Sequence, residues 1–235
     1  MPSGKAARRK RDRSPVTAAD RGAEELLRNR LRATFAGDGV LGEEFGEIPS
    51  ENGFRWILDP VDGTKAFVHG VPLFGTLIGL EKEGRMVAGI CRLPAAGAVV
   101  YAAEGGGAWW QVGSHEPRAA RVSETDDWDE AVACFTELDG YERIGRLDVL
   151  DALRSQASMV RGWGDCYGHL LVAAGRADVR VDPLMNPGDI AALIPILREA
   201  GGSCTGWNGA IGIDVGNGVS VNAALREKTL ALLKG

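Results

Sequence analysis

Apolar residues recur at intervals of three and four in the first part of the chain, at Ala23, Leu26, Leu27, Leu31 and Phe35. Side chains at this spacing share one face of an α-helix. Asp20 stands three residues after Thr17, which is the spacing of a helix-capping pair. The pattern therefore predicts a helix that begins at Thr17 and is ended by Gly37.

The next part of the chain has the pattern of an antiparallel sheet. FRWILD at 54–59 is predicted to be a buried strand, ended by Pro60 because proline has no amide hydrogen to donate. The polar residues 82–85 separate two apolar runs, which indicates a hairpin. We therefore predict that residues 54–111 are mainly antiparallel sheet, followed by a polar connection over residues 112–130.

Strand and helix patterns alternate in the second half of the chain. Strands are predicted at 131–136 and 177–182, and helices at 147–156, 166–174, 189–200 and 222–233. Strands interleaved with helices imply layered α and β structure.

The domain organisation that we expect is one compact unit with two lobes. An N-terminal α+β lobe covers 14–125 and a C-terminal α/β lobe covers 126–235. Residues 1–13 are polar and basic, and are expected to form a disordered tail.

Composition excludes several classes of protein. A length of 235 residues suits one large domain or two lobes with a shared core. The net charge of −5 argues against a general nucleic-acid surface, and the basic run at 5–13 contains no aromatic residue, so it is interpreted as a solvated tail rather than a nucleic-acid arm. No apolar run is long enough for a membrane span, and the basic start is not followed by the apolar segment of a secretory signal. The four cysteines form no CxxC pair, which indicates reduced thiols and a cytoplasmic location.

The densest chemistry follows the strand at 54–59. Asp59 and Asp62 stand so close together that their carboxylates repel each other unless a cation lies between them. With the Val61 carbonyl nearby, these hard oxygen ligands suit magnesium. The amides of Gly63 and Thr64 could begin a helix and hold a phosphate oxygen. Taken alone, the segment also fits a surface turn, because Asp, Pro and Gly are common turn residues.

Three other acidic positions are candidates. Glu43 lies in a Gly-Glu-Glu segment, Asp182 follows an apolar run, and Asp189 follows a Pro-Gly turn. Two of them have an ordinary alternative: a solvated loop for Glu43, and a helix N-cap for Asp189. Cys166 lies in an apolar helix pattern and is interpreted as a core residue rather than a nucleophile.

Together these segments resemble the inositol monophosphatase superfamily. The resemblance is carried by GEE at 42–44, WILDPVDGT at 56–64 and DIAA at 189–192, with Gly188 where the family usually has Trp and Ala66 where Asn often stands. It implies a layered αβαβα sandwich of the inositol monophosphatase and fructose-bisphosphatase type. Four stretches look closest to the histidinol-phosphate phosphatase branch: SPVTAAD (14–20), LGEEFGE (41–47), GDCYGHLLVAAGRAD (164–178) and DIAALIPILREAGG (189–202).

The resemblance also implies a role for each candidate. Two or three magnesium ions would be held by Glu43, Asp59, the Val61 carbonyl, Asp62 and Asp189. Thr64 and Glu43 would orient the attacking water, with Asp59 as a further catalytic residue. The amides of Gly63 and Thr64 would hold the phosphate, and Asp182 would contact the rest of the substrate. Asp165 lies near where specificity is set, and a buried structural role for it is equally open.

The reaction implied is direct attack of a metal-activated water on a small phosphate monoester. Histidinol phosphate, converted to histidinol in histidine biosynthesis, is the first choice of substrate. An inositol phosphatase, a broad sugar-phosphate phosphatase and a non-catalytic scaffold on the same fold are the alternatives. The chain begins without an additional helix usual in the family, so exposed apolar surface and a homodimer that covers it are expected. Gly188 is expected to leave Asp189 less preorganised.

Overall fold

The computed structural model describes residues 8–9, 15–16 and 18–234. Arg8–Arg9 (β1) pairs antiparallel with Pro15–Val16 (β2). The rest of the predicted disordered tail, residues 1–13, lies outside the described residues. Helix α1, Ala18–Thr34, confirms the helix predicted from the apolar spacing.

The first sheet has eight strands in the order β10-β9-β8-β7-β6-β5-β3-β4. Its strands are β3 Gly39–Gly42, β4 Gly46–Ile48, β5 Phe54–Asp62, β6 Gly75–Lys82, β7 Arg85–Leu93, β8 Ala98–Ala103, β9 Ala108–Val112 and β10 Arg118–Ala120. All neighbouring strands are antiparallel except β3 and β5, which are parallel. The predicted antiparallel sheet over 54–111 and its hairpin at 82–85 are thus confirmed.

The second sheet has five strands in the order β12-β11-β13-β15-β14. Its strands are β11 Val132–Phe135, β12 Met159–Arg161, β13 Val179–Asp182, β14 Ser203–Thr205 and β15 Gly218–Val221. The remaining helices are α2 Thr64–Val68, α3 Leu138–Arg143, α4 Leu147–Gln156, α5 Asp165–Ala173, α6 Pro187–Ala191, α7 Leu193–Glu199 and α8 Arg226–Lys234, with a 3₁₀ turn at Pro94–Ala96.

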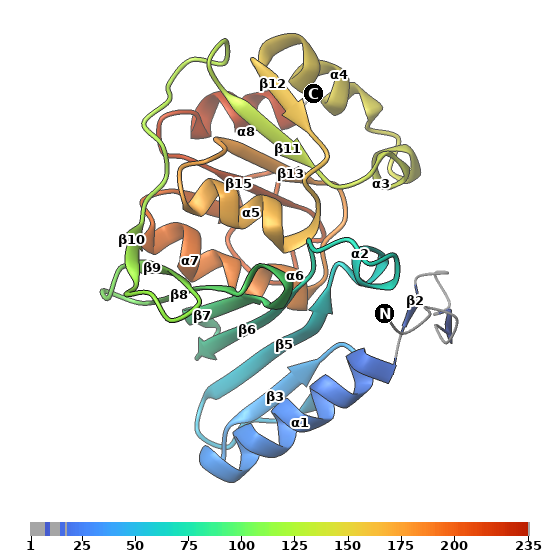
Figure 1. The fold of residues 1–235 in the computed structure, drawn as a ribbon, viewed down its shortest axis with the longest axis vertical. Helices are drawn as coiled ribbons and strands as arrows, with labels where there is room; N and C mark the ends of the chain where they lie inside the picture. Colours follow the sequence, from blue (N-terminus) through green and yellow to red (C-terminus); the bar gives the residue numbers. More distant parts are fainter. Residues whose placement is uncertain (1–7, 10–14, 17, 235) are drawn as a thin grey trace.

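Figure 1 shows five layers. Helix α1 lies against β5 on the outer side of the first sheet, and α5, α6 and α7 lie between the two sheets. Helices α4 and α8 lie on the outer side of the second sheet. The larger apolar core fills the space between the sheets and the smaller one lies under α4 and α8. The expected αβαβα sandwich is therefore confirmed, and the predicted lobe boundary at 125/126 falls in the segment between β10 and β11.

Close packing of α6 and α7 on the first sheet depends on glycines at paired positions of β6 and β7. Gly79 and Gly89 face each other across the two strands. A Cβ atom on Gly79 would lie 2.8 Å from the Cβ of Ala191, and one on Gly89 would lie 2.2 Å from the carbonyl oxygen of Ala192. The α6–α7 junction can therefore rest directly on the strands, because neither position has a side chain.

Several predicted boundaries are wrong, each for a local reason. Pro60 does not end its strand, because β5 continues to Asp62. The pairing of β5 with β6 shifts register between Asp59 and Asp62, which indicates a β-bulge. Proline is tolerated at a bulge because the ladder of hydrogen bonds is already interrupted there. The helix predicted at 189–200 is two helices that meet at Ala192, because Pro195 has no amide to donate back to the preceding turn.

Two further differences concern the connections. The segment predicted as a polar connection, 112–130, includes strand β10. The last helix begins at Arg226 rather than Asn222, because the Asn222 side chain is used as a cap: it accepts from the Leu225 amide at 2.8 Å and donates to the carbonyl of Thr125 at 2.8 Å. All four cysteines are free and buried. Within residues 18–234, every helix is too short or too polar to cross a bilayer.

Candidate active site

The bulge at the end of β5 brings two carboxylates to the face between the sheets. Asp59 is 3% exposed and its Oδ1 accepts a hydrogen bond from the Val61 amide at 3.0 Å. Asp62 is half-buried and accepts from the amide of Cys166 at the start of α5. The bulge turns Asp62 to the side that Asp59 faces, which a regular two-residue alternation would not do for residues three apart.

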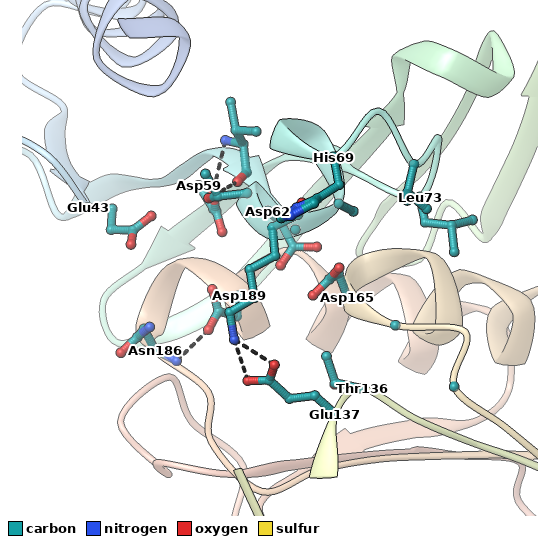
Figure 2. A pocket seen from close by; sticks show the side chains of 18 residues that line it. Glu43, Asp59, Asp62, His69, Leu73, Thr136, Glu137, Asp165, Asn186 and Asp189 are labelled. Carbon is teal, nitrogen blue, oxygen red and sulfur yellow. Dashed lines mark hydrogen bonds and ion pairs between the residues drawn. The ribbon is translucent and has the colours of Figure 1, made fainter. Parts of the chain in front are cut away.

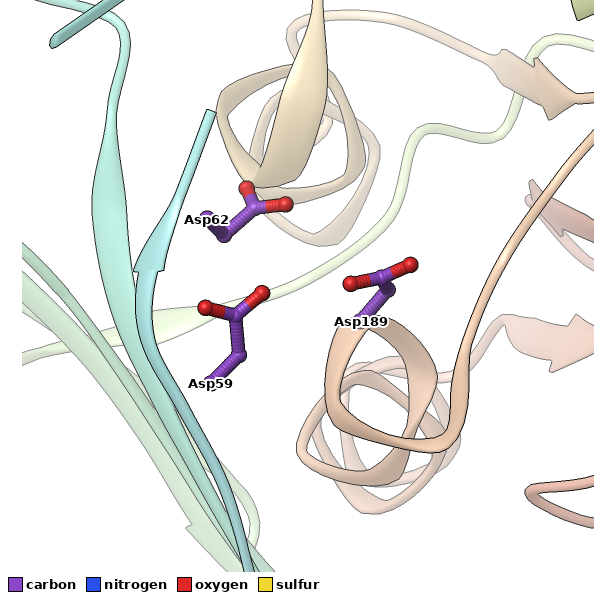
Figure 3. A group of neighbouring side chains, drawn as sticks. All are labelled: Asp59, Asp62 and Asp189. Carbon is purple, nitrogen blue, oxygen red and sulfur yellow. The ribbon is translucent and has the colours of Figure 1, made fainter. Parts of the chain in front are cut away.

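Asp189 enters from α6 and completes a cluster of three carboxylates. Figure 3 shows Asp59, Asp62 and Asp189 facing one another, and one oxygen from each lies within 4.8 Å of the other two. Asp189 and Asn186 form a reciprocal cap at the start of α6, in which Asp189 Oδ2 accepts from the Asn186 amide at 2.7 Å. The helix N-cap is therefore Asn186 and not Asp189, which stands at the third helical position; the Asp189 carboxylate completes the cap and also belongs to the cluster.

Gly188 lets this helix approach the strand. A Cβ atom there would lie 3.1 Å from the Asp59 Cβ and 3.1 Å from the Leu58 carbonyl oxygen. The sequence predicts that glycine leaves Asp189 freer; in the structure the reciprocal cap with Asn186 and this close packing hold the turn instead.

The electrostatics of the cluster favour a bound cation. Burial raises the pKa of Asp59 and of Asp62 well above the ordinary value, and the charges of neighbouring carboxylates raise both further. Burial also raises the pKa of Asp189 to about 6. Ionising all three together is costly because like charges are held close in a poorly solvated space. Three hard oxygen donors with this electrostatic need fit a divalent ion such as magnesium.

A cavity of about 480 Å³ opens over the cluster (Figure 2). Eight of the nine predicted site residues line it: Glu43, Asp59, Val61, Asp62, Gly63, Thr64, Asp165 and Asp189. Glu43 projects from the turn between β3 and β4, on the side of the cavity opposite Asp165. Residues from both halves of the chain therefore meet in one hollow.

Gly63 and Asp165 are in direct contact across the cavity floor. Gly63 has a φ of 77° at the start of α2, and a Cβ there would lie 2.7 Å from Asp165 Oδ2. Asp165 itself has a φ of 54°, which a side chain rarely adopts. Burial raises the pKa of the Asp165 carboxyl to about 6. Glycine adopts a positive φ without steric cost, so the unfavourable backbone conformation here is that of Asp165.

Asp182 is the predicted site residue that does not line the cavity. It is 6% exposed, accepts from His169 Nε2 at 2.7 Å and from Arg180 at 2.9 Å, and also accepts from the Thr136 hydroxyl. Burial opposes its ionisation, but Arg180 and His169 lower its pKa below the usual value. Burial lowers the pKa of His169, so the ring is a neutral donor. Thr136, which lines the cavity, lies between Asp182 and the hollow.

Several residues at the site were not predicted, and four of them have polar contacts that bear on its chemistry. Asp20, read from the sequence only as a helix-capping residue, is 1% exposed and lies 3.3 Å from the Thr64 hydroxyl. Thr136, Glu137 and Lys65 line the cavity, and Lys65 Nζ pairs with Glu137 Oε1 at 2.7 Å. The acidic residue in the first turn of a helix was the available signal for Asp20; the other three carry none in the sequence.

Comparisons with known proteins identify relatives of this chain. A sequence profile of the inositol monophosphatase family matches residues 3–234. The chain is 48% identical over 225 residues to a histidinol-phosphatase of Chlorobaculum parvum, covering 95% of this chain and 85% of that protein. It is 38% identical over 224 residues to a histidinol-phosphatase of Mycobacterium tuberculosis, covering 95% and 86%. Among solved structures, the extragenic suppressor protein suhB of Bartonella henselae superposes with a TM-score of 0.87 at 32% identity, covering 97% of this chain and 88% of that chain.

Proposed function

The chain belongs to the inositol monophosphatase family and is a metal-dependent phosphatase, and we propose that its substrate is histidinol phosphate, hydrolysed to histidinol and phosphate in histidine biosynthesis. Two relatives that bear the name histidinol-phosphatase, at 48% and 38% identity, support this substrate. The observation that carries the proposal is the cluster of Asp59, Asp62 and Asp189 in the floor of the cavity.

The proposed metal ligands are four acidic side chains that line the cavity, from the β3–β4 turn, β5 and α6, together with one backbone carbonyl: Glu43, Asp59, Asp62, Asp189 and the Val61 carbonyl. Magnesium, in two or three ions, is the proposed metal because the donors are hard oxygens. Magnesium bound there supplies charge neutralisation for the phosphate and lowers the pKa of a coordinated water.

The chain's own contribution to proton transfer is proposed to come from Thr64 and Asp20. The Thr64 hydroxyl lies 3.3 Å from Asp20 and 3.1 Å from the Val61 carbonyl, so its single hydrogen has two acceptors within the protein. Its remaining lone pairs can then accept a hydrogen bond from the attacking water. Glu43 is proposed to orient the same water from the opposite wall. The amides of Gly63 and Thr64 are proposed to bind a phosphate oxygen.

The far wall of the cavity suits a cationic leaving group. Histidinol phosphate has an ammonium group next to the ester and an imidazole ring that is partly protonated near neutral pH. Asp165 and Glu137 line that wall, where Glu137 is already paired with Lys65, so the match to a cation is proposed to depend on Asp165. An inositol phosphate has no positive charge there to match Asp165. Asp182 accepts a hydrogen bond from the Thr136 hydroxyl, and is proposed to act through Thr136 rather than by contacting the substrate.

A phosphate-release assay tests the substrate. Histidinol phosphate, inositol 1-phosphate, fructose 1,6-bisphosphate and glycerol 2-phosphate are compared at equal concentration, with magnesium and with EDTA. We expect the highest kcat/KM for histidinol phosphate and no turnover in EDTA. A higher kcat/KM for inositol phosphate would reject the proposed substrate. Absence of turnover for every ester would favour the non-catalytic scaffold.

Three further expectations stay predictions. The metal count is measured by elemental analysis of the protein after dialysis against magnesium. The homodimer is measured by size-exclusion chromatography with light scattering. The cytoplasmic location is measured by cell fractionation.

A further inference from the structure

The fully buried residues of α1 are polar, whereas Ala23, Leu27 and Leu31 of the apolar pattern that predicted the helix are only half-buried. Glu24 is fully buried and Arg28 is 7% exposed, whereas Leu26 is 57% exposed and Phe35 44% exposed. The two buried residues are four apart, so they lie on one face, and Arg28 Nε donates to Glu24 Oε1 at 2.8 Å. A buried ion pair is costly to form unless further hydrogen bonds satisfy its atoms. The other hydrogen-bond partners of Glu24 and Arg28 therefore identify the segment that this ion pair stabilises.

Those partners belong to the turn between β3 and β4 and to Gly46, the first residue of β4. Glu24 Oε2 accepts from the Glu44 amide at 2.8 Å, and Oε1 accepts from the Phe45 amide at 3.1 Å. Arg28 donates to the Gly46 carbonyl. One carboxylate and one guanidinium thus bind the backbone of three consecutive residues.

The other side of the turn is held by contact rather than by a hydrogen bond. A Cβ atom on Gly42 would lie 2.1 Å from Glu24 Oε1 and 2.9 Å from an Arg28 nitrogen. Gly42 pairs with Gly46 at the end of the β3–β4 ladder, so the three residues between them form the turn. The ion pair therefore touches the backbone on both sides of Glu43.

We propose that the buried Glu24–Arg28 pair is a positioning device that places Glu43 at the metal site. The inference rests on the proposed function, because it takes Glu43 to be a metal ligand. Glu43 is exposed on the cavity wall, and the turn that carries it is held by the hydrogen bonds from the Glu44 and Phe45 amides to Glu24. A charge-assisted hydrogen bond to an amide is short and directional, so two of them with the guanidinium contact leave the turn little freedom.

The first test is a magnesium titration by calorimetry on the folded protein, without substrate. Glu24→Gln is compared with Glu25→Gln, a change of the same type at an exposed position of the same helix. The amide keeps the size of the side chain but presents an NH₂ group to one backbone amide. We expect Glu24→Gln to weaken magnesium binding by about 10- to 100-fold, the range for changes behind a ligand. Glu25→Gln is expected to bind as the wild type does. Wild-type affinity in Glu24→Gln would overturn the inference.

A double-mutant cycle separates positioning from a general loss of structure. If Glu24 acts through Glu43, Glu24→Gln should cause no further loss of affinity in a Glu43→Gln background. A full additional loss there would show that Glu24 acts elsewhere. If Glu43→Gln alone left magnesium affinity unchanged, the ligand role of Glu43 in the proposed function would be rejected as well. If Glu43→Gln weakened binding and Glu24→Gln did not, only the positioning role would fail.

Arg28→Lys keeps the test decisive if Glu24→Gln does not fold. Lysine preserves the charge but lacks the fork that reaches both Glu24 and the Gly46 carbonyl. The matched control is Arg30→Lys on the exposed side of α1. We expect weaker magnesium binding in Arg28→Lys, with a circular dichroism spectrum like that of the wild type. Equal affinities for Arg28→Lys and Arg30→Lys would overturn the inference.

Discussion

The Thr64 hydroxyl oxygen lies 3.3 Å from a carboxylate oxygen of Asp20, across a separation of 44 residues in the chain. Asp20 stands in the first turn of α1 and Thr64 opens α2, so the contact joins the outer helix layer to the cavity. Asp20 is buried at 1% exposure. A buried carboxylate next to a hydroxyl that lines a site can fix the direction of its proton.

Asp20→Asn should therefore slow the chemical step. The amide keeps the shape of the side chain but is a weaker acceptor for the Thr64 hydroxyl. We expect kcat to fall by about 100-fold or more, the range of a lost acid–base contribution. KM and the magnesium concentration for half-maximal activity are expected to change little. Asp151→Asn, whose side chain is 75% exposed, is the control in the same assay. Unchanged kcat in Asp20→Asn would reject the role of this contact.

Asp59→Asn should raise the melting temperature of the metal-free protein and reduce the increase in melting temperature that magnesium causes. Burial and neighbouring carboxylates raise the pKa of Asp59, so its anion is unfavourable in the metal-free protein at alkaline pH. Removing that charge is expected to raise the metal-free melting temperature, by about 2–4 °C for each kcal/mol gained. The same variant should lose most of the stabilisation caused by magnesium, and its turnover. Differential scanning calorimetry in EDTA and in magnesium measures both. A lower melting temperature in EDTA would contradict the repulsion.

The stabilisation by magnesium should increase with pH. The pKa of Asp189 is raised from 3.8 to about 6, and burial raises the pKa values of Asp59 and Asp62 well above the ordinary value. Between the ordinary and the raised pKa values the folded state binds more protons than the unfolded state. Metal-free stability therefore falls as pH rises through the raised values. Protons and magnesium compete for the same oxygens, so less metal is bound at low pH.

The measurement is the magnesium-induced shift in melting temperature at a series of pH values. We expect a small shift at about pH 5 and a larger one at about pH 8, with most of the change near and above pH 6. Asp59→Asn is the comparison, since one of the competing groups is absent. A shift that is equal at both ends of the series would show that these carboxylates do not bind the metal.

Gly188→Ala should weaken the site although alanine is a small residue. The new Cβ would lie 3.1 Å from the Asp59 Cβ and from the Leu58 carbonyl, so α6 must move away from β5. That movement separates Asp189 from Asp59. We expect magnesium affinity to fall by about tenfold, the lower end for changes beside a ligand.

The control for this change is Gly22→Ala. Gly22 is exposed on α1, and a Cβ atom there would meet nothing within 4 Å. Helix propensity predicts a gain of about 1 kcal/mol in stability and no change in magnesium affinity. Calorimetric titration of both variants measures the difference. Equal magnesium affinities of the two variants would show that a Cβ atom at position 188 fits without moving α6 away from β5.

The sequence alone determined the local elements and the identity of the acidic residues. The apolar spacing of α1, the hairpin at 82–85 and the helix at 147–156 are short-range patterns, and the structure has each of them. The predicted site residues could be named because WILDPVDGT and DIAA carry a family resemblance. The end of β5 was mispredicted because proline usually ends a strand, and only the neighbouring strand shows that a bulge tolerates it.

Tertiary structure decided which of these residues meet and what holds them. Asp20 and Thr64, Gly63 and Asp165, and Glu24 and the turn that carries Glu43 are contacts between segments distant in the chain. The buried Glu24 also shows why the helical pattern misled: charged residues are normally solvated, and this one is buried because backbone amides of another segment satisfy its carboxylate. The spacing of apolar residues indicates which side chains of a helix are buried because they are apolar. It cannot indicate that a charged side chain is buried, because the hydrogen-bond donors that satisfy that charge lie in a distant segment that only the fold brings close.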